Sequence, residues 1–189
     1  MSEILFINPI SVEISLFIIK NGICKEKYTL TQWDDFSQFP EKVIELLYKY
    51  NIKEIWCICG PGWFTRMRII TLTLNTLILS RWLDVKWCHF FHLIKKNIPI
   101  MRANDQEYII RSLSWEDSLV KKALIPLGVY IWYGEKNDFT DERVLIEYRE
   151  DFSEITRIFA SIPVIDTLTP LYLKDPHITL WSKKNTSPF

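Results

Sequence analysis

The stretch that decides the fold reads Gly60-Pro61-Gly62-Trp63-Phe64-Thr65-Arg66-Met67-Arg68-Ile69. An apolar run, 54–59, precedes it, and a long segment with few charges, 65–82, follows it. The chain of 189 residues holds only five glycines. This loop is therefore the one place in the sequence where successive backbone amides can approach a phosphate. The pattern predicts a junction between a buried strand and a long apolar element.

The residues before this stretch predict three antiparallel strands, a helix and a fourth strand. Asn21-Gly22 is typical of a two-residue hairpin turn, because both positions tolerate a positive φ. Ser37 is a candidate helix N-cap, Pro40 lies near the first turn, and Asn51 ends the helix. The predicted elements are strands 4–10, 13–20 and 23–30, helix 37–51 and strand 54–59.

These elements predict a mixed five-stranded sheet. The first three strands follow one another closely and are expected to be antiparallel. A helix connects the third strand to strand 54–59, so a right-handed crossover would place 54–59 beside strand 4–10 and parallel to it.

Segment 65–82 supports two interpretations on its residues alone. Thr71, Thr73 and Asn75 alternate with their neighbours in a way that favours a strand. The absence of a turn signal favours a long helix instead. A helix that is apolar on most faces has to be buried or shared with a partner. Its uncharged part, 69–80, is too short for a membrane-spanning helix, which needs about 20 residues.

The second half of the chain predicts shorter elements. Strands are expected over 86–91, 107–113, 129–133 and 144–148, and a helix over 151–160, where Asp151 stands at the N-terminal end. Segment 171–181 is expected to be irregular or extended, and 185–189 to be a frayed tail. The sequence contains no internal repeat.

Composition narrows the classes of function. The chain has 23 basic and 23 acidic residues and no formal net charge, which argues against nucleic-acid binding by electrostatics alone. The first apolar run follows Glu3 instead of a basic region, so no targeting signal is expected. The four cysteines have no framework-like spacing, which favours reduced thiols. We expect a cytoplasmic protein.

The decisive stretch resembles the GPGSFTGLRIG signature of the bacterial TsaB family. Trp63 replaces the serine of this signature, Arg66 replaces the glycine after its threonine, and Met67 replaces its leucine. The matching positions are Gly60, Pro61, Gly62, Phe64, Thr65, Arg68 and Ile69. Residues 170–174, Pro-Leu-Tyr-Leu-Lys, are similar to the family's C-terminal P-x-Y-L-R motif. The first strand departs from the family, since it ends in Asn-Pro-Ile at 8–10 where D-T-S is usual. Residues 102–107 match the family's D-A-R and E-V-Y motifs poorly.

This resemblance implies an α/β fold of the actin and sugar-kinase superfamily. Each half would contain a ribonuclease-H-like mixed sheet, and the second domain would be reduced. The implied division is an N-terminal actin-like domain over 1–100 and a reduced C-terminal domain over 101–189. On this resemblance, segment 65–82 is a helix at a subunit interface.

The resemblance also implies a role. TsaB-family members are noncatalytic partners of the related TsaD subunit. Together with an ATPase subunit, they support transfer of a threonylcarbamoyl group to the adenosine next to the anticodon in certain tRNAs. The implied partners are thus a TsaD-like subunit or a second copy of this chain, with tRNA met only through the complex and no membrane.

The expected partner interface lies on segment 65–82 and just before it. Leu72 and Leu79 are seven residues apart and would share one helix face. Arg68 is either a partner-facing anchor or a solvated group near the helix start. The interface residues are Phe64, Thr65, Arg68, Leu72, Asn75 and Leu79.

The residues predict no catalytic site and no cofactor. Asn8 stands where this superfamily needs an acid on the first strand, and Pro9 removes a backbone donor that a phosphate would use. Trp63 and Arg66 add bulk in the loop, although Arg66 and Arg68 leave nucleotide binding open. Two alternatives to a scaffold remain: a small ATP-dependent, kinase-like enzyme of the same superfamily, and an unrelated protein-interaction module.

Two clusters contain residue types that can bind a metal or form a redox pair, but their spacing favours a structural role. Cys88, His89 and His92 carry zinc-binding side chains, but no second group of ligands accompanies them. Cys57 and Cys59 would share one face of a strand and lack the spacing of a redox pair. We therefore expect packed side chains and no metal site.

Overall fold

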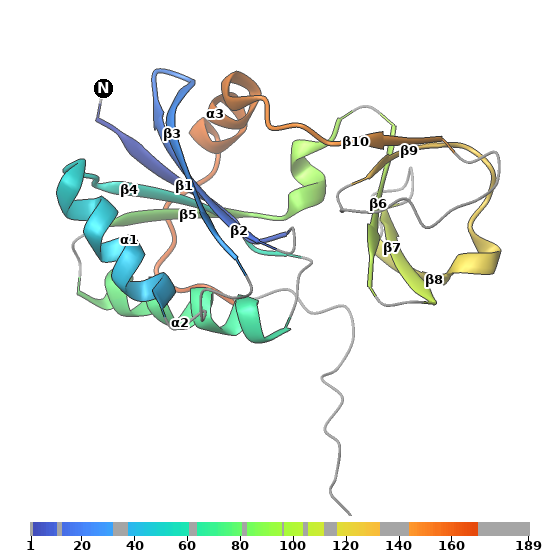
Figure 1. Cartoon of the computed structure of the whole chain (residues 1–189), viewed down its shortest axis with the longest axis horizontal. Coiled ribbons are helices and arrows are strands. Elements are labelled where there is room, and N and C mark those ends of the chain that lie inside the picture. The colour runs from blue at the N-terminus through green and yellow to red at the C-terminus, as the bar shows by residue number, and fades with distance from the viewer. Residues whose placement is uncertain are drawn as a thin grey trace, which may run out of the picture.

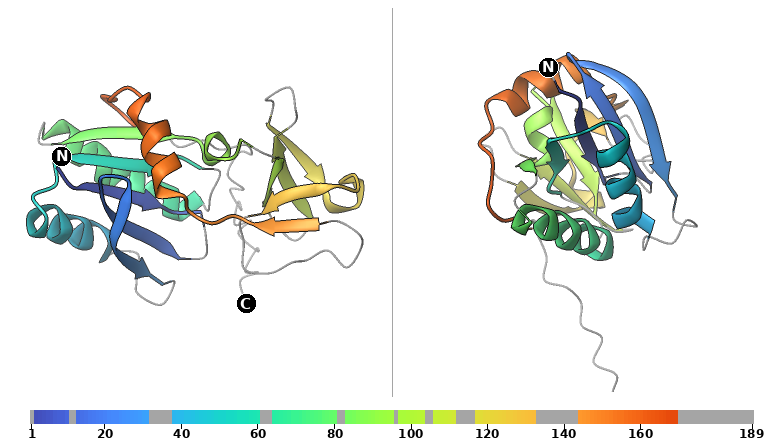
Figure 2. Two further views of the ribbon diagram at one scale, coloured as in Figure 1. Left: turned by 90° about the horizontal axis from the view of Figure 1, so that it is seen from above. Right: turned by 90° about the vertical axis from the view of Figure 1, so that its left-hand side faces the viewer.

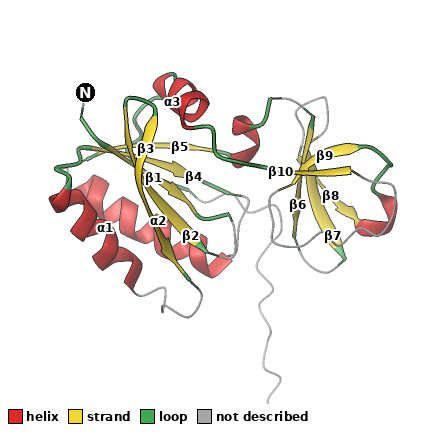
Figure 3. Ribbon diagram, turned by 45° about the horizontal axis from the view of Figure 1, so that its top comes forward, coloured by secondary structure: helices red, strands yellow, loops and turns green. Residues whose placement is uncertain are grey.

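A computed structural model of the protein shows two β-sheets side by side (Figure 1). Helices lie against the first sheet, whereas the second sheet is accompanied in its described part only by a short 3-10 helix (Figure 3). The structure describes residues 2–10, 13–31, 38–60, 64–80, 83–95, 97–103, 106–111, 117–132 and 144–169.

The first sheet has the predicted topology. Its strand order is β3-β2-β1-β4-β5. The strands are β1 (Ile4–Asn8), β2 (Ile14–Lys20), β3 (Ile23–Leu30), β4 (Glu54–Ile58) and β5 (Asp84–Cys88). β1 pairs antiparallel with β2 and parallel with β4. Both predictions for this sheet, the antiparallel opening and the parallel crossover, are confirmed.

Local chemistry explains the chain reversals around this sheet. Asn21 and Gly22 adopt φ values of 53° and 73°, as the turn between β2 and β3 requires. Helix α1 (Gln38–Lys49) ends just before Asn51, which takes a left-handed φ of 49°. Asparagine tolerates that conformation, so the chain can leave the helix and enter β4.

Three helices pack on the first sheet. α1 and α2 (Phe64–Leu79) lie on one face, and α3 (Phe152–Ala160) lies on the other (Figure 2). α2 resolves the ambiguity of segment 65–82 in favour of a helix. α3 buries Phe159, whose ring stacks on Trp56 with centroids 5.1 Å apart. Asp151 caps α3 by accepting backbone N–H bonds from Ser153 and Glu154, each at 3.1 Å.

The second sheet repeats the topology of the first. Its order is β10-β9-β6-β7-β8. The strands are β6 (Ile98–Arg102), β7 (Glu107–Arg111), β8 (Asp117–Lys121), β9 (Val129–Trp132) and β10 (Val144–Glu147). β6 to β8 form an antiparallel meander, and β9 and β10 then continue the sheet in parallel. The repeat is one of connectivity and not of residues, so it was expected only from the family resemblance and not from an internal sequence repeat.

The second sheet is the reduced copy. In the first sheet α1 joins the third strand to the fourth. Between the corresponding strands β8 and β9, the chain forms only the 3-10 helix η2 (Lys122–Leu124). Two mixed α/β sheets, the second with little helix, are the fold that the sequence predicts.

Two strands of the second sheet were not predicted, and β5 of the first sheet was predicted to end later than it does. β6 contains Pro99, which lacks a ladder donor and argues against a strand. β8 is an edge strand with charged ends, Asp117 and Lys121, and only partial burial. The expected strand 86–91 ends at Cys88, because the 3-10 helix η1 (Phe90–Leu93) begins there.

Two connections link the sheets. One passes from β5 through η1 to β6, and the other returns from β10 through residues 148–151 to α3. Tyr148 on the return packs edge-on against Phe90 of η1, with ring centroids 5.1 Å apart. The boundary at residue 100 stays a prediction: the second sheet begins at Ile98, and α3 packs back on the first. Among the described residues, none of the helices is long and apolar enough to cross a membrane.

Candidate functional site

The loop that opens α2 begins in an unusual backbone conformation. Gly60 has a φ of 123°, which a residue with a Cβ rarely adopts. Its carbonyl accepts a bond from the Phe90 backbone N–H at 2.9 Å, so the loop is anchored to η1. Residues 61–63 and the side chains of Phe64 and Thr65 lie outside the described part, although both of the latter belong to α2.

A buried arginine occupies the region where this loop meets β1. Arg66 is 3% exposed, and its NH1 donates to the Pro9 carbonyl at 3.0 Å. The sequence analysis placed Arg66 where a small residue normally allows close approach. In the structure this guanidinium joins α2 to the β1–β2 connection from inside the protein.

Asn8 stands where the family resemblance would place an acid, and its amide is held in a buried hydrogen bond. Asn8 is 1% exposed, and its Nδ2 donates to Oε1 of Glu150 at 3.0 Å. Its Oδ1 accepts from the Ile10 backbone N–H at 3.2 Å. Both polar atoms of the Asn8 amide therefore make hydrogen bonds within the protein. A carboxylate at position 8 would meet a second carboxylate, Glu150, which makes the arrangement specific for an amide.

The expected interface residues of α2 divide into two groups. Leu72 is 60% exposed and Leu79 is 80% exposed, and Arg68 is exposed as well. Asn75 instead binds the chain's own backbone, since its Oδ1 accepts from Leu168 N at 2.7 Å and its Nδ2 donates to Leu168 O at 3.1 Å. One side of α2 is thus covered by the segment before Thr169, and another side presents leucines.

The exposed side of α2 is more apolar than its sequence suggests. Thr73 and Thr76 donate their hydroxyls to the carbonyls of Ile69 and Leu72, each at 2.9 Å. Both hydroxyls are therefore occupied within the helix. The exposed surface of α2 therefore presents Leu72, Leu79 and Thr76, together with Arg68.

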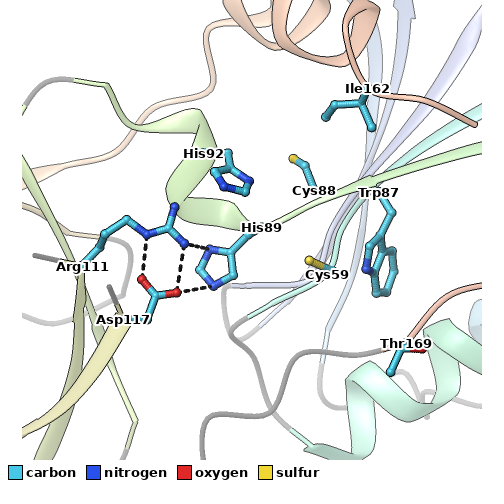
Figure 4. Close-up of a pocket in the computed structure, with 9 residues that line it drawn as sticks. All are labelled: Cys59, Trp87, Cys88, His89, His92, Arg111, Asp117, Ile162 and Thr169. Atoms are coloured by element: carbon cyan, nitrogen blue, oxygen red, sulfur yellow. Dashed lines mark hydrogen bonds and ion pairs between the residues drawn. The ribbon is translucent and has the colours of Figure 1, made fainter. Parts of the chain in front are cut away.

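A cavity of about 520 Å³ lies at the carboxyl ends of β4 and β5 (Figure 4). Crevices at the carboxyl ends of parallel strands are the usual ligand sites of α/β sheets. The lining comes from both sheets and from the segment after α3: Cys59, Trp87, Cys88, His89, His92, Arg111, Asp117, Ile162 and Thr169.

An ion pair from the second sheet forms one wall of this cavity. The Arg111 guanidinium donates from Nε to Asp117 Oδ1 at 2.7 Å and from NH2 to Oδ2 at 2.9 Å. Arg111 also lies over the Phe91 ring, 5.2 Å from its centroid. The pair is nearly buried, and two parallel bonds fix its geometry.

His89 completes this cluster from the first sheet. Its Nδ1 accepts from the Phe91 backbone N–H at 3.0 Å and faces Arg111 NH2 at 3.3 Å. The proton of the neutral ring therefore sits on Nε2, which lies 3.2 Å from Asp117 Oδ2. That contact is too misaligned for a good hydrogen bond, so its effect is chiefly electrostatic. With Nδ1 capped by donors, His89 is poorly placed to act as a general base.

The cysteines of the cavity are thiols and not thiolates. Burial raises the pKa of Cys59 to about 12, and burial together with Cys59 raises the pKa of Cys88 further. Both are therefore poor nucleophiles. Within the described residues, no three His, Cys, Asp or Glu side chains are grouped so as to hold a metal ion.

The comparisons with known proteins find similarity in structure and none in sequence. No protein-family model matches the chain, and no curated protein matches it. The structure of YeaZ from Pseudomonas aeruginosa is similar with a TM-score of 0.64 at 12% identity, over 92% of this chain and all of that one. An uncharacterized protein described as similar to peptidase YeaZ from Pseudomonas aeruginosa has a TM-score of 0.60 at 13% identity, with the same coverage. These similarities show the fold, which is that of the two YeaZ-type structures, with two mixed α/β sheets.

Sequence reasoning found part of the site. It singled out Arg66 and Asn8, and it noticed Cys88, His89 and His92 as neighbours in the chain. It missed Arg111, Asp117 and Glu150, whose partners lie on other elements. The opposite charges of Arg111 and Asp117 at facing ends of a hairpin were the one available signal, and it was lost because β8 was not predicted.

Proposed function

We propose that this chain is a noncatalytic, TsaB-like partner subunit that supports threonylcarbamoyl transfer to tRNA by a TsaD-like protein. The observation that carries the proposal is the place of the signature-like stretch in the fold. It begins directly after β4 and opens α2, in a chain whose fold is similar along 92% of its length to that of YeaZ, also called TsaB. The signature and the fold thus point to the same family independently.

The residues at the superfamily's nucleotide position support a binding role in place of a chemical one. The first strand ends in a buried amide that Glu150 holds. The Arg66 guanidinium binds the Pro9 carbonyl at the end of the first strand. Neither group supplies the carboxylate that metal and water need in phosphoryl transfer.

The surface of α2 supports the choice of partner region. Leu72 and Leu79 are among the most exposed large apolar side chains of the described residues. An apolar surface of this kind on a helix suits a partner that also presents apolar side chains. We propose that a TsaD-like subunit binds this surface. The alternative is a second copy of this chain, and the test distinguishes the two.

The test is affinity capture of this chain from its native organism, followed by mass spectrometry of what is retained. We expect a TsaD-like subunit in stoichiometric amount. Analytical ultracentrifugation of the purified chain measures self-association in parallel. Recovery of the chain as a stable homodimer without a TsaD-like subunit would contradict the proposal.

A further inference from the structure

We infer that His89, Arg111 and Asp117 form a latch that holds the connection leaving the first sheet against the second sheet, and that acid opens this latch. His89 follows directly after β5, Arg111 ends β7 and Asp117 begins β8. The inference concerns the angle between the two sheets and is independent of the proposed function.

The latch joins two parts of the molecule by side chains that are largely removed from water. The side chains of His89, Arg111 and Asp117 are only 6%, 9% and 11% exposed. Arg111 binds Asp117 through two bonds and faces Nδ1 of His89 at 3.3 Å, while Asp117 faces Nε2 at 3.2 Å. The histidine ring thus lies beside the Arg111–Asp117 pair, with one nitrogen toward the cation and the other toward the anion (Figure 4).

This arrangement requires the neutral ring. Nδ1 accepts the Phe91 N–H that begins η1, and it faces an N–H of Arg111 on its other side. A protonated ring carries N–H on both nitrogens. It would direct a donor at two donors and place a second cation beside Arg111. Protonation therefore removes the cap of η1 and repels the strand that carries Arg111.

The groups around His89 shift its pKa in opposite directions. Asp117 on β8 favours the charged ring, whereas burial, Arg111 on β7 and His92 on η1 disfavour it. Cys59 and Cys88, which line the same cavity, are neutral thiols. Burial is the largest effect and lowers the pKa of His89 to about 4.

The sign of the pH effect follows from this. The latched state keeps the ring neutral, while a ring released into water has its ordinary pKa of about 6.5. The latch is therefore at full strength above about pH 6.5 and weakens as the pH falls toward 4. The apolar contacts between the sheets, made by residues such as Phe90, Phe91, Met101 and Ile109, carry no titrating group. Acid should therefore let the angle between the two sheets vary more widely, while the sheets stay in contact.

The test measures the distance between the sheets by pulsed electron spin resonance. Spin labels go on Tyr48→Cys in α1 and Leu124→Cys in η2, which are 73% and 69% exposed. Cys24, the one cysteine that is not buried, is replaced by serine. We expect a narrow distribution of distances between the two labels at pH 7.5. At pH 4.5 the width of this distribution should increase reversibly by at least twofold. Far-UV circular dichroism, recorded alongside, should stay constant.

Two variants assign the change to His89. His89→Asn does not titrate and retains an oxygen that can cap Phe91 N–H, so its distribution should be the same at both pH values. His92→Asn, on the same turn, is the matched control and should broaden as the parent does. The latch is overturned if the parent distribution does not change, if His89→Asn broadens like the parent, or if circular dichroism is lost over the same pH range.

Discussion

Nδ2 of Asn8 donates a hydrogen bond to Oε1 of Glu150 over 3.0 Å, which joins the first strand to a residue 142 positions later in the chain. The bond lies at the position where the family resemblance led us to look for an acid. It also fixes the return connection from the second sheet against the first. One buried amide therefore supports the fold at the end of β1.

This bond predicts that an acid cannot be restored at position 8 alone. Asn8→Asp places two carboxylates within hydrogen-bond distance, so it should lower stability at pH 7 by about 1–3 kcal/mol. The loss should shrink below about pH 5, because one carboxylate can then take up a proton. Thermal unfolding of the two variants Asn8→Asp and Asn8→Asp/Glu150→Gln measures the effect.

Glu150→Gln in that pair removes the repulsion and supplies a donor to the new carboxylate. The double variant should recover most of the lost stability, and Glu150→Gln alone should change little, because its amide oxygen still accepts from Asn8. Equal stability of Asn8→Asp and the parent would show that the bond does not constrain this position.

The second prediction concerns nucleotide. Asn8 supplies an amide where a nucleotide site would need an acid, this amide binds Glu150, and the Arg66 guanidinium binds the Pro9 carbonyl. Isothermal titration calorimetry with ATP and magnesium should show no heat beyond dilution. Binding in the micromolar range would contradict the scaffold role and favour the kinase-like alternative.

The third prediction concerns the thiols. Burial raises the pKa of all four thiols, but Cys57, Cys59 and Cys88 are buried, whereas Cys24 is partly exposed and can be reached by a reagent. Ellman's reagent should modify one thiol of the native protein quickly at pH 8 and all four after denaturation. Cys24→Ser should abolish the fast phase. A fast phase that survives this substitution would mean that the cavity opens to the reagent.

The first sheet could be predicted because its signals are local. The Asn21-Gly22 turn, the amphipathic helix after Ser37 and the run before Gly60 each follow from neighbouring residues. The second sheet could not be predicted to the same extent, because Pro99 and the charged ends of β8 are local features that argue against strands. Pairing with β7 and β9 overrides them in the folded chain.

The candidate site likewise contains residues that could be predicted from the sequence and residues that could not. Asn8 and Arg66 could be found because they depart from a motif. Asn75 was expected to face a partner, and the structure shows its amide bound to the backbone of Leu168. Nothing near Asn75 in the sequence reveals that bond, since its other half lies 93 positions away. The latch residues likewise come from three separate elements.

The proposed partner surface is the exposed side of α2, and the binding affinity of two matched double variants is its sharpest test. Leu72→Asp/Leu79→Asp places two charges on the exposed side of α2. Leu124→Asp/Leu127→Asp makes the same change at leucines that are 69% and 65% exposed on the second half. Because all four side chains are exposed, both variants should fold with a cooperative thermal transition.

The measurement is the Kd of each variant for the TsaD-like subunit. Burying an unpaired charge costs several kcal/mol, so we expect Leu72→Asp/Leu79→Asp to weaken binding by at least about 100-fold and Leu124→Asp/Leu127→Asp to bind like the parent. Parent-like binding by Leu72→Asp/Leu79→Asp, or equal weakening of both variants, would show that α2 is not the partner surface.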